Sequence, residues 1–236
     1  MKISKATAKG ARSYQEDRYL VFSTIMGTYL GVWDGHGGAE CAALCAKVLP
    51  SILTNDPSLS YALDELNKMT RTMRAGSTAS LVFIPKDEHR VEIAVLGDSP
   101  VIAKLADGSI FVSEEHNVRT NMAEADAAIA RGGFVNSGYL FASYSGNGLQ
   151  MTRSLGDYEL DSVLSREPEV FSHVLGKDSW VLVCSDGAVD PGHIDAKDSI
   201  DSIVALVEAG GDAQEIVERA LAAKTGDNVT AILVRL

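Results

Sequence analysis

Apolar residues recur along the chain in two spacings, one typical of strands and one typical of helices. Alternating or continuous apolar runs predict strands at residues 18–25, 28–33, 77–84, 91–96, 101–105, 109–112, 180–184 and 229–234. Apolar residues three and four positions apart predict helices at residues 39–53, 59–74 and 123–130, and two further helices before the last strand. Turn residues such as Ala106-Asp107-Gly108 separate these elements.

The order of the elements predicts an α+β fold. Pairs of helices stand between blocks of strands that suit antiparallel pairing, and the strand–helix alternation of a doubly wound fold is missing. We therefore expect a central antiparallel β-sandwich flanked by helix pairs, in four layers. Residues 114–150 are less regular and contain several glycines, which is typical of a flap. No linker or composition shift marks a second domain, so residues 1–236 are expected to form one domain.

Composition excludes several classes of function. The formal charge of −11 over 236 residues argues against nucleic-acid binding, which depends on clustered Lys and Arg. No apolar stretch approaches the roughly 20 residues that span a bilayer, and no signal-like run opens the chain. Cys41, Cys45 and Cys184 lie in apolar settings typical of buried thiols rather than of a zinc site. We expect a cytoplasmic monomer without a targeting tail.

Acidic residues stand at the ends of several predicted strands. They are Glu16 and Asp17 before the strand at 18, Asp34, Asp98 and Asp186 after later strands, and Asp227 before the last strand. In antiparallel sheets the end of one strand lies beside the start of the next, so these carboxylates can meet at one edge. Each one alone could be an ordinary turn residue. Together they predict a site for Mg²⁺ or Mn²⁺, which prefer oxygen ligands.

The sequence Asp34-Gly35-His36-Gly37-Gly38 directly follows the predicted strand at 28–33. Glycine permits a tight turn and a close approach to the backbone, so the carboxylate of Asp34 would be held rigidly. His36, two residues on, could donate a proton to a bound ligand. The alternative for this motif alone is a tight loop without function.

With these residues in place, the chain resembles the metal-dependent type 2C protein serine/threonine phosphatases, the PPM family. The matching motifs run in order through nearly the whole chain: Arg12-Ser13-Tyr14-Gln15-Glu16-Asp17, Asp34-Gly35-His36-Gly37-Gly38, Gly76-Ser77-Thr78-Ala79, Gly97-Asp98-Ser99, Arg153-Ser154-Leu155-Gly156-Asp157, Ser185-Asp186-Gly187 and Gly226-Asp227-Asn228. The family fold, a β-sandwich flanked by helix pairs, agrees with the fold expected from the apolar pattern.

The resemblance implies a metal ligand set. Asp34 would bridge two Mg²⁺ or Mn²⁺ ions, and the Gly35 carbonyl would also be a ligand. Glu16 would bind one ion, with Asp17 behind it orienting water. The other ion would be held by Asp186 and Asp227. Asp98 and Asp190 match positions that bind a third, weaker ion in the family.

The resemblance also implies a reaction. Arg12 would hold the phosphate of a phosphorylated protein, and His36 would be the general acid that protonates the leaving alkoxide. A hydroxide bridging the two ions would attack phosphorus directly, without a phosphoenzyme or a cysteine nucleophile. Asp157 is expected to shape its turn rather than bind metal. The other histidines are expected to be surface or structural: His89, His116, His173 and His193.

Two departures from the family pattern bear on these expectations. Pro100 follows Gly97-Asp98-Ser99 where an arginine is common, and the flap region diverges, which leaves substrate choice open. The same chemistry on a small phosphoester or on phosphotyrosine is one alternative. A non-catalytic module that binds phosphoproteins is another, disfavoured because Asp34, His36 and Asp186 are all present.

Overall fold

Two five-stranded sheets form the centre of the molecule in the computed structural model, which describes residues 1–86, 89–144, 146–191 and 197–236. The first sheet has the strand order β1 (Lys2–Ala8), β15 (Val229–Arg235), β14 (Trp180–Cys184), β8 (Val101–Lys104) and β9 (Ile110–Val112). The second has the order β13 (Glu169–Val174), β7 (Arg90–Leu96), β6 (Ala79–Pro85), β3 (Gly27–Trp33) and β2 (Arg18–Ser23). Neighbouring strands in both sheets are antiparallel.

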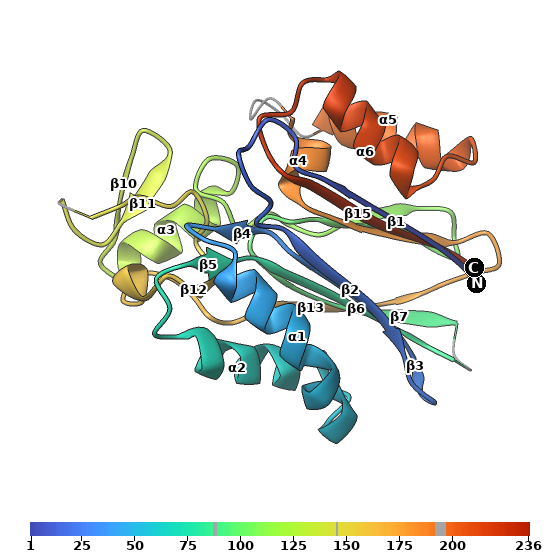
Figure 1. The fold of residues 1–236 in the computed structure, drawn as a ribbon, viewed down its shortest axis with the longest axis horizontal. Coiled ribbons are helices and arrows are strands. Elements are labelled where there is room, and N and C mark those ends of the chain that lie inside the picture. The colour runs from blue at the N-terminus through green and yellow to red at the C-terminus, as the bar shows by residue number, and fades with distance from the viewer. Residues whose placement is uncertain (87–88, 145, 192–196) are drawn as a thin grey trace.

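The two sheets pack face to face, with helices on both outer sides (Figure 1). Val32 and Val95 of one sheet join Val183 and Ile232 of the other in a single buried apolar cluster. Helices α1 (Glu40–Asn55) and α2 (Leu59–Thr70) cover the outer face of the second sheet, and α4 (Asp186–Val189), α5 (Lys197–Glu208) and α6 (Ala213–Ala222) cover the first. The predicted α+β sandwich is confirmed.

Helix ends largely follow the local sequence signals. Asp212 caps α6 through the backbone N–H groups of Gln214 and Glu215, and Glu215 completes the capping box. Helix α2 ends at Thr70, earlier than the predicted residue 74, and a turn follows in which the Met73 N–H donates to the Thr70 carbonyl at 2.7 Å. Within the described residues, we find no helix with the length and apolar character that crossing a bilayer requires.

Several strands were not predicted from the apolar pattern. The edge strands β1 and β13 alternate between covered and exposed side chains, and Ala6 is the only buried residue of β1. Their mixed composition carries little hydrophobic signal. The predicted strand at 77–84 is divided: β6 begins at Ala79, and β5 (Gly76–Ser77) belongs to a small sheet with β4 (Gly35–His36) and β12 (Leu155–Gly156).

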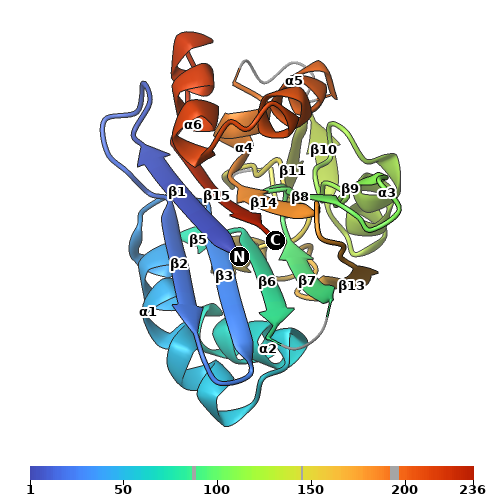
Figure 2. The same cartoon turned by 90° about the vertical axis from the view of Figure 1, so that its right-hand side faces the viewer.

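The flap has its own small core at one end of the sandwich. It contains α3 (Met122–Ala130) and the hairpin of β10 (Phe134–Asn136) and β11 (Tyr139–Phe141). Ala128 and Leu140 share this buried cluster with Leu160, Val163 and Leu164, which follow the predicted flap in sequence. Both chain termini lie together, away from the flap (Figures 1 and 2).

Candidate metal centre

Strand register brings the predicted acidic residues to one end of the sandwich. Arg18 pairs with Trp33 in the β2–β3 ladder, so Asp17 and Asp34 are adjacent where these strands meet. In the other sheet Cys184 pairs with Ala231, which places Asp186 beside the start of β15. Strands β3 and β7 run in the same direction on either side of β6, so the residues that follow them also leave at one end.

A cleft of about 340 Å³ opens at this end. Its lining includes Arg12, Asp34, Gly35, His36, Asp98, Asp186 and Asp227, with Tyr139 and residues 148–151 of the flap region. A larger cavity of about 620 Å³ lies near Met1 and Leu236, but its described lining contains no Asp or Glu side chain. The smaller cleft is therefore the candidate site, because its described lining combines four of the predicted acidic residues with Arg12 and His36.

Burial and mutual repulsion disfavour the charged forms of the cleft carboxylates. Burial, together with the neighbouring Asp17 and Asp186 charges, raises the pKa of Asp34 well above its usual range. The pKa of Asp186 is raised in the same way, by burial and by the charges of Asp98 and Asp227. Burial also raises the pKa of Asp98. Cations would relieve this repulsion by giving the carboxylates opposite charges to pair with.

The donor groups fit a hard divalent cation. The carboxylate oxygens Asp17 Oδ1 and Asp186 Oδ1 are buried without a hydrogen-bond partner among the described residues. Across the described ranges, however, no three acidic, His or Cys side chains already converge as a closed metal cage. Mg²⁺ commonly keeps several waters and uses only one or two carboxylates, so an open arrangement of this kind suits it.

Three predicted metal-site residues lie outside the lining of the cleft: Glu16, Asp17 and Asp190. Glu16 is buried, but its Oε1 accepts a hydrogen bond from the Gly38 N–H at 2.6 Å, and it does not line the cleft. Asp190 follows α4, where its N–H donates to the Asp186 carbonyl at 2.7 Å. It is also outside the cleft lining. Asp34, Asp98, Asp186 and Asp227 are thus the predicted carboxylates that line the cleft.

Neutral hydrogen-bond donors and acceptors hold the acidic loops in place. Asp17 Oδ2 accepts from Ser185 Oγ at 2.9 Å and from Thr230 Oγ1 at 2.7 Å, which ties β2 to the other sheet. The Asp34 N–H donates to Thr78 Oγ1 at 3.0 Å. A side chain at Gly35 would lie 2.7 Å from the Glu16 carbonyl oxygen, so only glycine allows this approach.

Arg12 reaches the cleft from the loop between β1 and β2. Its Nη2 donates to Asp227 Oδ2 at 2.6 Å and its Nε to the Gly226 carbonyl at 3.1 Å. The side chain is about half exposed, at 49%. A guanidinium at this position can therefore be reached by an anionic ligand that enters the cleft.

His36 has a partner that the sequence prediction missed. Its Nε2 lies 2.8 Å from Asp157 Oδ2, and Asp157 also accepts from Ser154 Oγ at 2.6 Å. A side chain at Gly76 would clash with both members, 2.0 Å from Asp157 Oδ2 and 2.2 Å from His36 Nε2. Asp157 has a left-handed backbone with φ of 51°, which is uncommon for a residue other than glycine. The sequence motif contained Asp157, but its contact with His36 depends on the fold.

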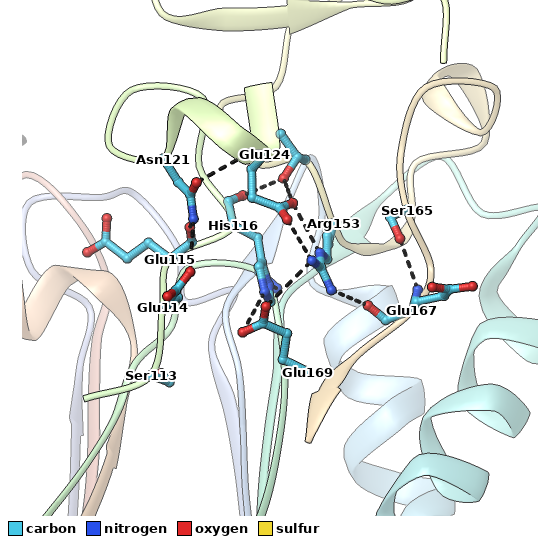
Figure 3. Close-up of polar contacts among 12 residues, drawn as sticks. Ser113, Glu114, Glu115, His116, Asn121, Glu124, Arg153, Ser165, Glu167 and Glu169 are labelled. Atoms are coloured by element: carbon cyan, nitrogen blue, oxygen red, sulfur yellow. Dashed lines mark hydrogen bonds and ion pairs between the residues drawn. The ribbon is translucent and has the colours of Figure 1, made fainter. Parts of the chain in front are cut away.

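The other histidines behave as expected where the structure describes them. His173 packs against the Phe111 ring, with centroids 4.3 Å apart, and His116 is fully buried in a polar network beneath the flap (Figure 3). His193 lies outside the described residues.

Comparison with known proteins gives consistent matches over most of the chain. Residues 23–229 match the family model described as Protein phosphatase 2C. A probable protein phosphatase 2C from Arabidopsis thaliana is 26% identical over 253 residues, which cover 98% of this chain and 65% of that relative. The chain thus spans about two-thirds of that relative's length.

Solved structures show the same fold. A sex-determining protein of C. elegans has a TM-score of 0.81 and 27% identity, covering 98% of this chain and 64% of that chain. The catalytic domain of the serine/threonine protein phosphatase PstP, solved in complex with two manganese ions, has a TM-score of 0.65 and 20% identity. That match covers 98% of this chain and 96% of the PstP domain.

The environment of Asp17 predicts an unusual pH dependence of stability in metal-free protein. Burial raises the pKa of Asp17 to about 6, above the unfolded value of about 3.9. The folded state therefore binds this proton more tightly than the unfolded state does. Proton binding by Asp17 stabilises the fold in full below the unfolded pKa, and this stabilisation is lost as pH rises through about 6. The expected loss is about 3 kcal/mol in the free energy of unfolding.

Urea denaturation in EDTA at a series of pH values measures this effect. Asp17→Asn should lack that part of the pH dependence, whereas Asp64→Asn on the exposed face of α2 should keep it. Equal pH profiles for the wild type and Asp17→Asn would contradict the assignment.

Proposed function

Because the chain belongs to the protein phosphatase 2C family, we propose that it is a Mg²⁺- or Mn²⁺-dependent phosphatase acting on phosphoserine and phosphothreonine in proteins. The family resemblance predicted from the sequence motifs is confirmed by the family match. One observation carries the proposal beyond family membership: four buried or partly buried carboxylates line a single cleft together with Arg12 and His36. Phosphoester hydrolysis needs metal ligands, an anion-binding group and a proton donor.

Asp34 is proposed to contact two divalent cations, with the Gly35 carbonyl beside it. Glu16 would complete one position, and Asp186 and Asp227 the other. The raised pKa values of Asp34 and Asp186 support this assignment, because their charges lack any nearby compensation other than Arg12 among the described groups of the cleft. When bound, the ions would lower the pKa of a water molecule and so supply the hydroxide that attacks phosphorus directly.

Three further acidic residues are assigned supporting parts. Asp17, fixed by Ser185 and Thr230, has one oxygen left to accept a hydrogen bond and would orient water in the cleft. Asp98 and Asp190 are assigned to a third, weaker cation. The assignment of Asp98 has the better structural support, because Asp98 lines the cleft and Asp190 does not.

Arg12 is proposed to bind the phosphate of the substrate. Its planar guanidinium can donate two parallel hydrogen bonds to phosphate oxygens. In the structure its Nη2 is paired with Asp227, and a phosphate entering the cleft would compete with that carboxylate for the guanidinium. Loss of this residue should therefore raise KM more than it lowers kcat.

His36 is proposed to protonate the leaving serine or threonine oxygen. In the protonated ring, Nε2 would keep its proton and donate a hydrogen bond to the carboxylate of Asp157. Nδ1 is buried and has no hydrogen-bond partner among the described residues, so no described protein group holds a proton at this nitrogen. Asp157 is a positioning residue in this scheme, because it acts through His36.

The cysteines support direct attack by water rather than by a thiol. Cys41, Cys45 and Cys184 are all buried, and none lines the cleft. Burial raises the pKa of Cys184, which disfavours the reactive thiolate. A monomeric state, a cytoplasmic location and the lack of nucleic-acid binding remain predictions from the sequence.

Phosphate release from a phosphothreonine peptide tests the proposed activity. We expect release in Mn²⁺ and none in excess EDTA. Asp186→Ala should lower kcat by more than about 100-fold, because loss even of groups that only support metal ligands costs 10- to 100-fold. Asp64→Ala on the exposed face of α2 is the matched control and should be unaffected.

Three outcomes would contradict the proposal. Release that survives EDTA in contaminant-free protein would overturn metal dependence. Release only from phosphotyrosine or small phosphoesters would overturn the substrate class. No release from any of these substrates would favour a non-catalytic binding module.

The contact between Asp157 and His36 predicts that substitution of Asp157 lowers kcat by an amount that depends on the leaving group of the substrate. Asp157→Asn should lower kcat on the phosphothreonine peptide by about 10- to 100-fold, part of the usual contribution of general acid catalysis. The loss should be much smaller with p-nitrophenyl phosphate, because its leaving group needs no proton. Glu159→Gln, an exposed neighbour, serves as the control. Equal losses on both substrates would assign Asp157 a purely structural part.

A further inference from the structure

Asp98 is held by a buried amide that no metal assignment includes. Asn117 Nδ2 donates to Asp98 Oδ2 at 2.8 Å, and both side chains are 7% exposed. Asn117 Oδ1 accepts from the Arg119 N–H at 2.9 Å. Since the carbonyl side of this amide is engaged by a backbone donor, its NH₂ group must face Asp98. One oxygen of Asp98 is thus committed to Asn117, and the direction of the carboxylate is fixed.

His116 holds the residue that precedes Asp98. The backbone N–H of His116 donates to the Gly97 carbonyl at 3.1 Å. The ring Nδ1 of His116 accepts from the Gly97 N–H at 3.0 Å. With Nδ1 an acceptor, the ring proton is on Nε2, which faces Glu169 Oε2 at 3.5 Å. Gly97 has a φ of +113°, a conformation that favours glycine. The turn before Asp98 is thus tied to His116 at two points.

The same segment is joined to the base of the flap. The Thr152 N–H donates to the His116 carbonyl at 2.8 Å, and Asn117 forms a β-bridge with Met151. Met151 and its neighbour Gln150 line the cleft. The support of Asp98 and one wall of the cleft are therefore parts of a single hydrogen-bonded unit.

A partly buried ion pair joins helix α3 to this unit, as Figure 3 shows. Arg153 donates to Glu124 of α3 through Nη2 at 2.6 Å and through Nε at 3.0 Å. Thr152 Oγ1 donates to Glu124 Oε2 at 2.6 Å. Burial alone would raise the pKa of Glu124, but the hydrogen bonds from Arg153 and Thr152 lower it to about 2. Glu124 therefore stays charged, and the pair with Arg153 persists, over the physiological pH range.

We propose that Asn117 is a positioning residue that aims the free oxygen of Asp98 into the cleft and thereby sets the affinity of the weakest cation position. The inference rests on the proposed function, because it extends the metal assignment of that cleft. Orienting partners of this kind commonly change metal affinity by about 10- to 100-fold. Asn117 also forms a β-bridge with Met151. The position of residues 150–151 and the direction of the Asp98 carboxylate therefore depend on each other.

Calorimetric titration of the metal-free chain with Mn²⁺ tests the proposal without substrate. Asn117→Ala removes both contacts of the amide. Asn117→Ser keeps a hydroxyl that can accept from the Arg119 N–H but is too short to reach Asp98. Both variants should raise the Kd of the weaker class of sites by about 10- to 100-fold and leave the tighter class unchanged. Asn55→Ala, at the exposed end of α1, is the matched control.

Other outcomes overturn the inference. Unchanged weak-site affinity in both variants would do so, as would a single class of sites in the wild type. Equal weakening of all classes with a lower melting temperature would show that Asn117 only supports the fold. The variants could show the selective rise in the Kd of the weaker sites while the wild type releases no phosphate from any substrate. That result would overturn the proposed function but would still support the role of Asn117 in cation binding.

Discussion

Electrostatic repulsion among buried carboxylates is the constraint on which the rest of this structure depends. Asp98 is buried and Asp34 and Asp186 are half-buried, and burial together with neighbouring carboxylate charges raises the pKa of each. Burying an unpaired charge is among the most costly arrangements in a folded protein. Cations that bind there, or protons at lower pH, relieve this cost. The proposed metal centre follows from this constraint.

The sandwich supplies the rigidity that such a site requires. The strand register in each sheet fixes the positions of the acidic residues at the strand ends. The apolar cluster between the sheets fixes the position of one sheet against the other. Neutral groups then orient individual carboxylates: Ser185 and Thr230 on Asp17, and Asn117 on Asp98. Hydroxyl and amide donors direct a carboxylate without neutralising it, which leaves its charge available to a cation. The Asp157 carboxylate is used differently, since it pairs with His36.

The sequence was sufficient to predict the sandwich, its helix pairs and the acids at the strand ends, because these depend on local periodicity and on strand direction. It was insufficient for the edge strands β1 and β13, whose half-exposed faces carry little apolar signal. The contact of Asp157 with His36 spans 121 positions and depends on Gly76 being small, so no local pattern reveals it. Nor could spacing show that Glu16 and Asp190 lie outside the cleft lining that Asp34 and Asp98 share.

The most direct test of this account compares thermal unfolding at neutral pH in EDTA and in Mn²⁺ for the wild type and Asp186→Asn. The variant should melt at a higher temperature than the wild type in EDTA, because one repelling charge has been removed. Mn²⁺ should also raise the melting temperature of the wild type far more than that of the variant. A variant that is less stable in EDTA and gains as much from Mn²⁺ as the wild type would contradict the claim that buried carboxylates are held together by cations.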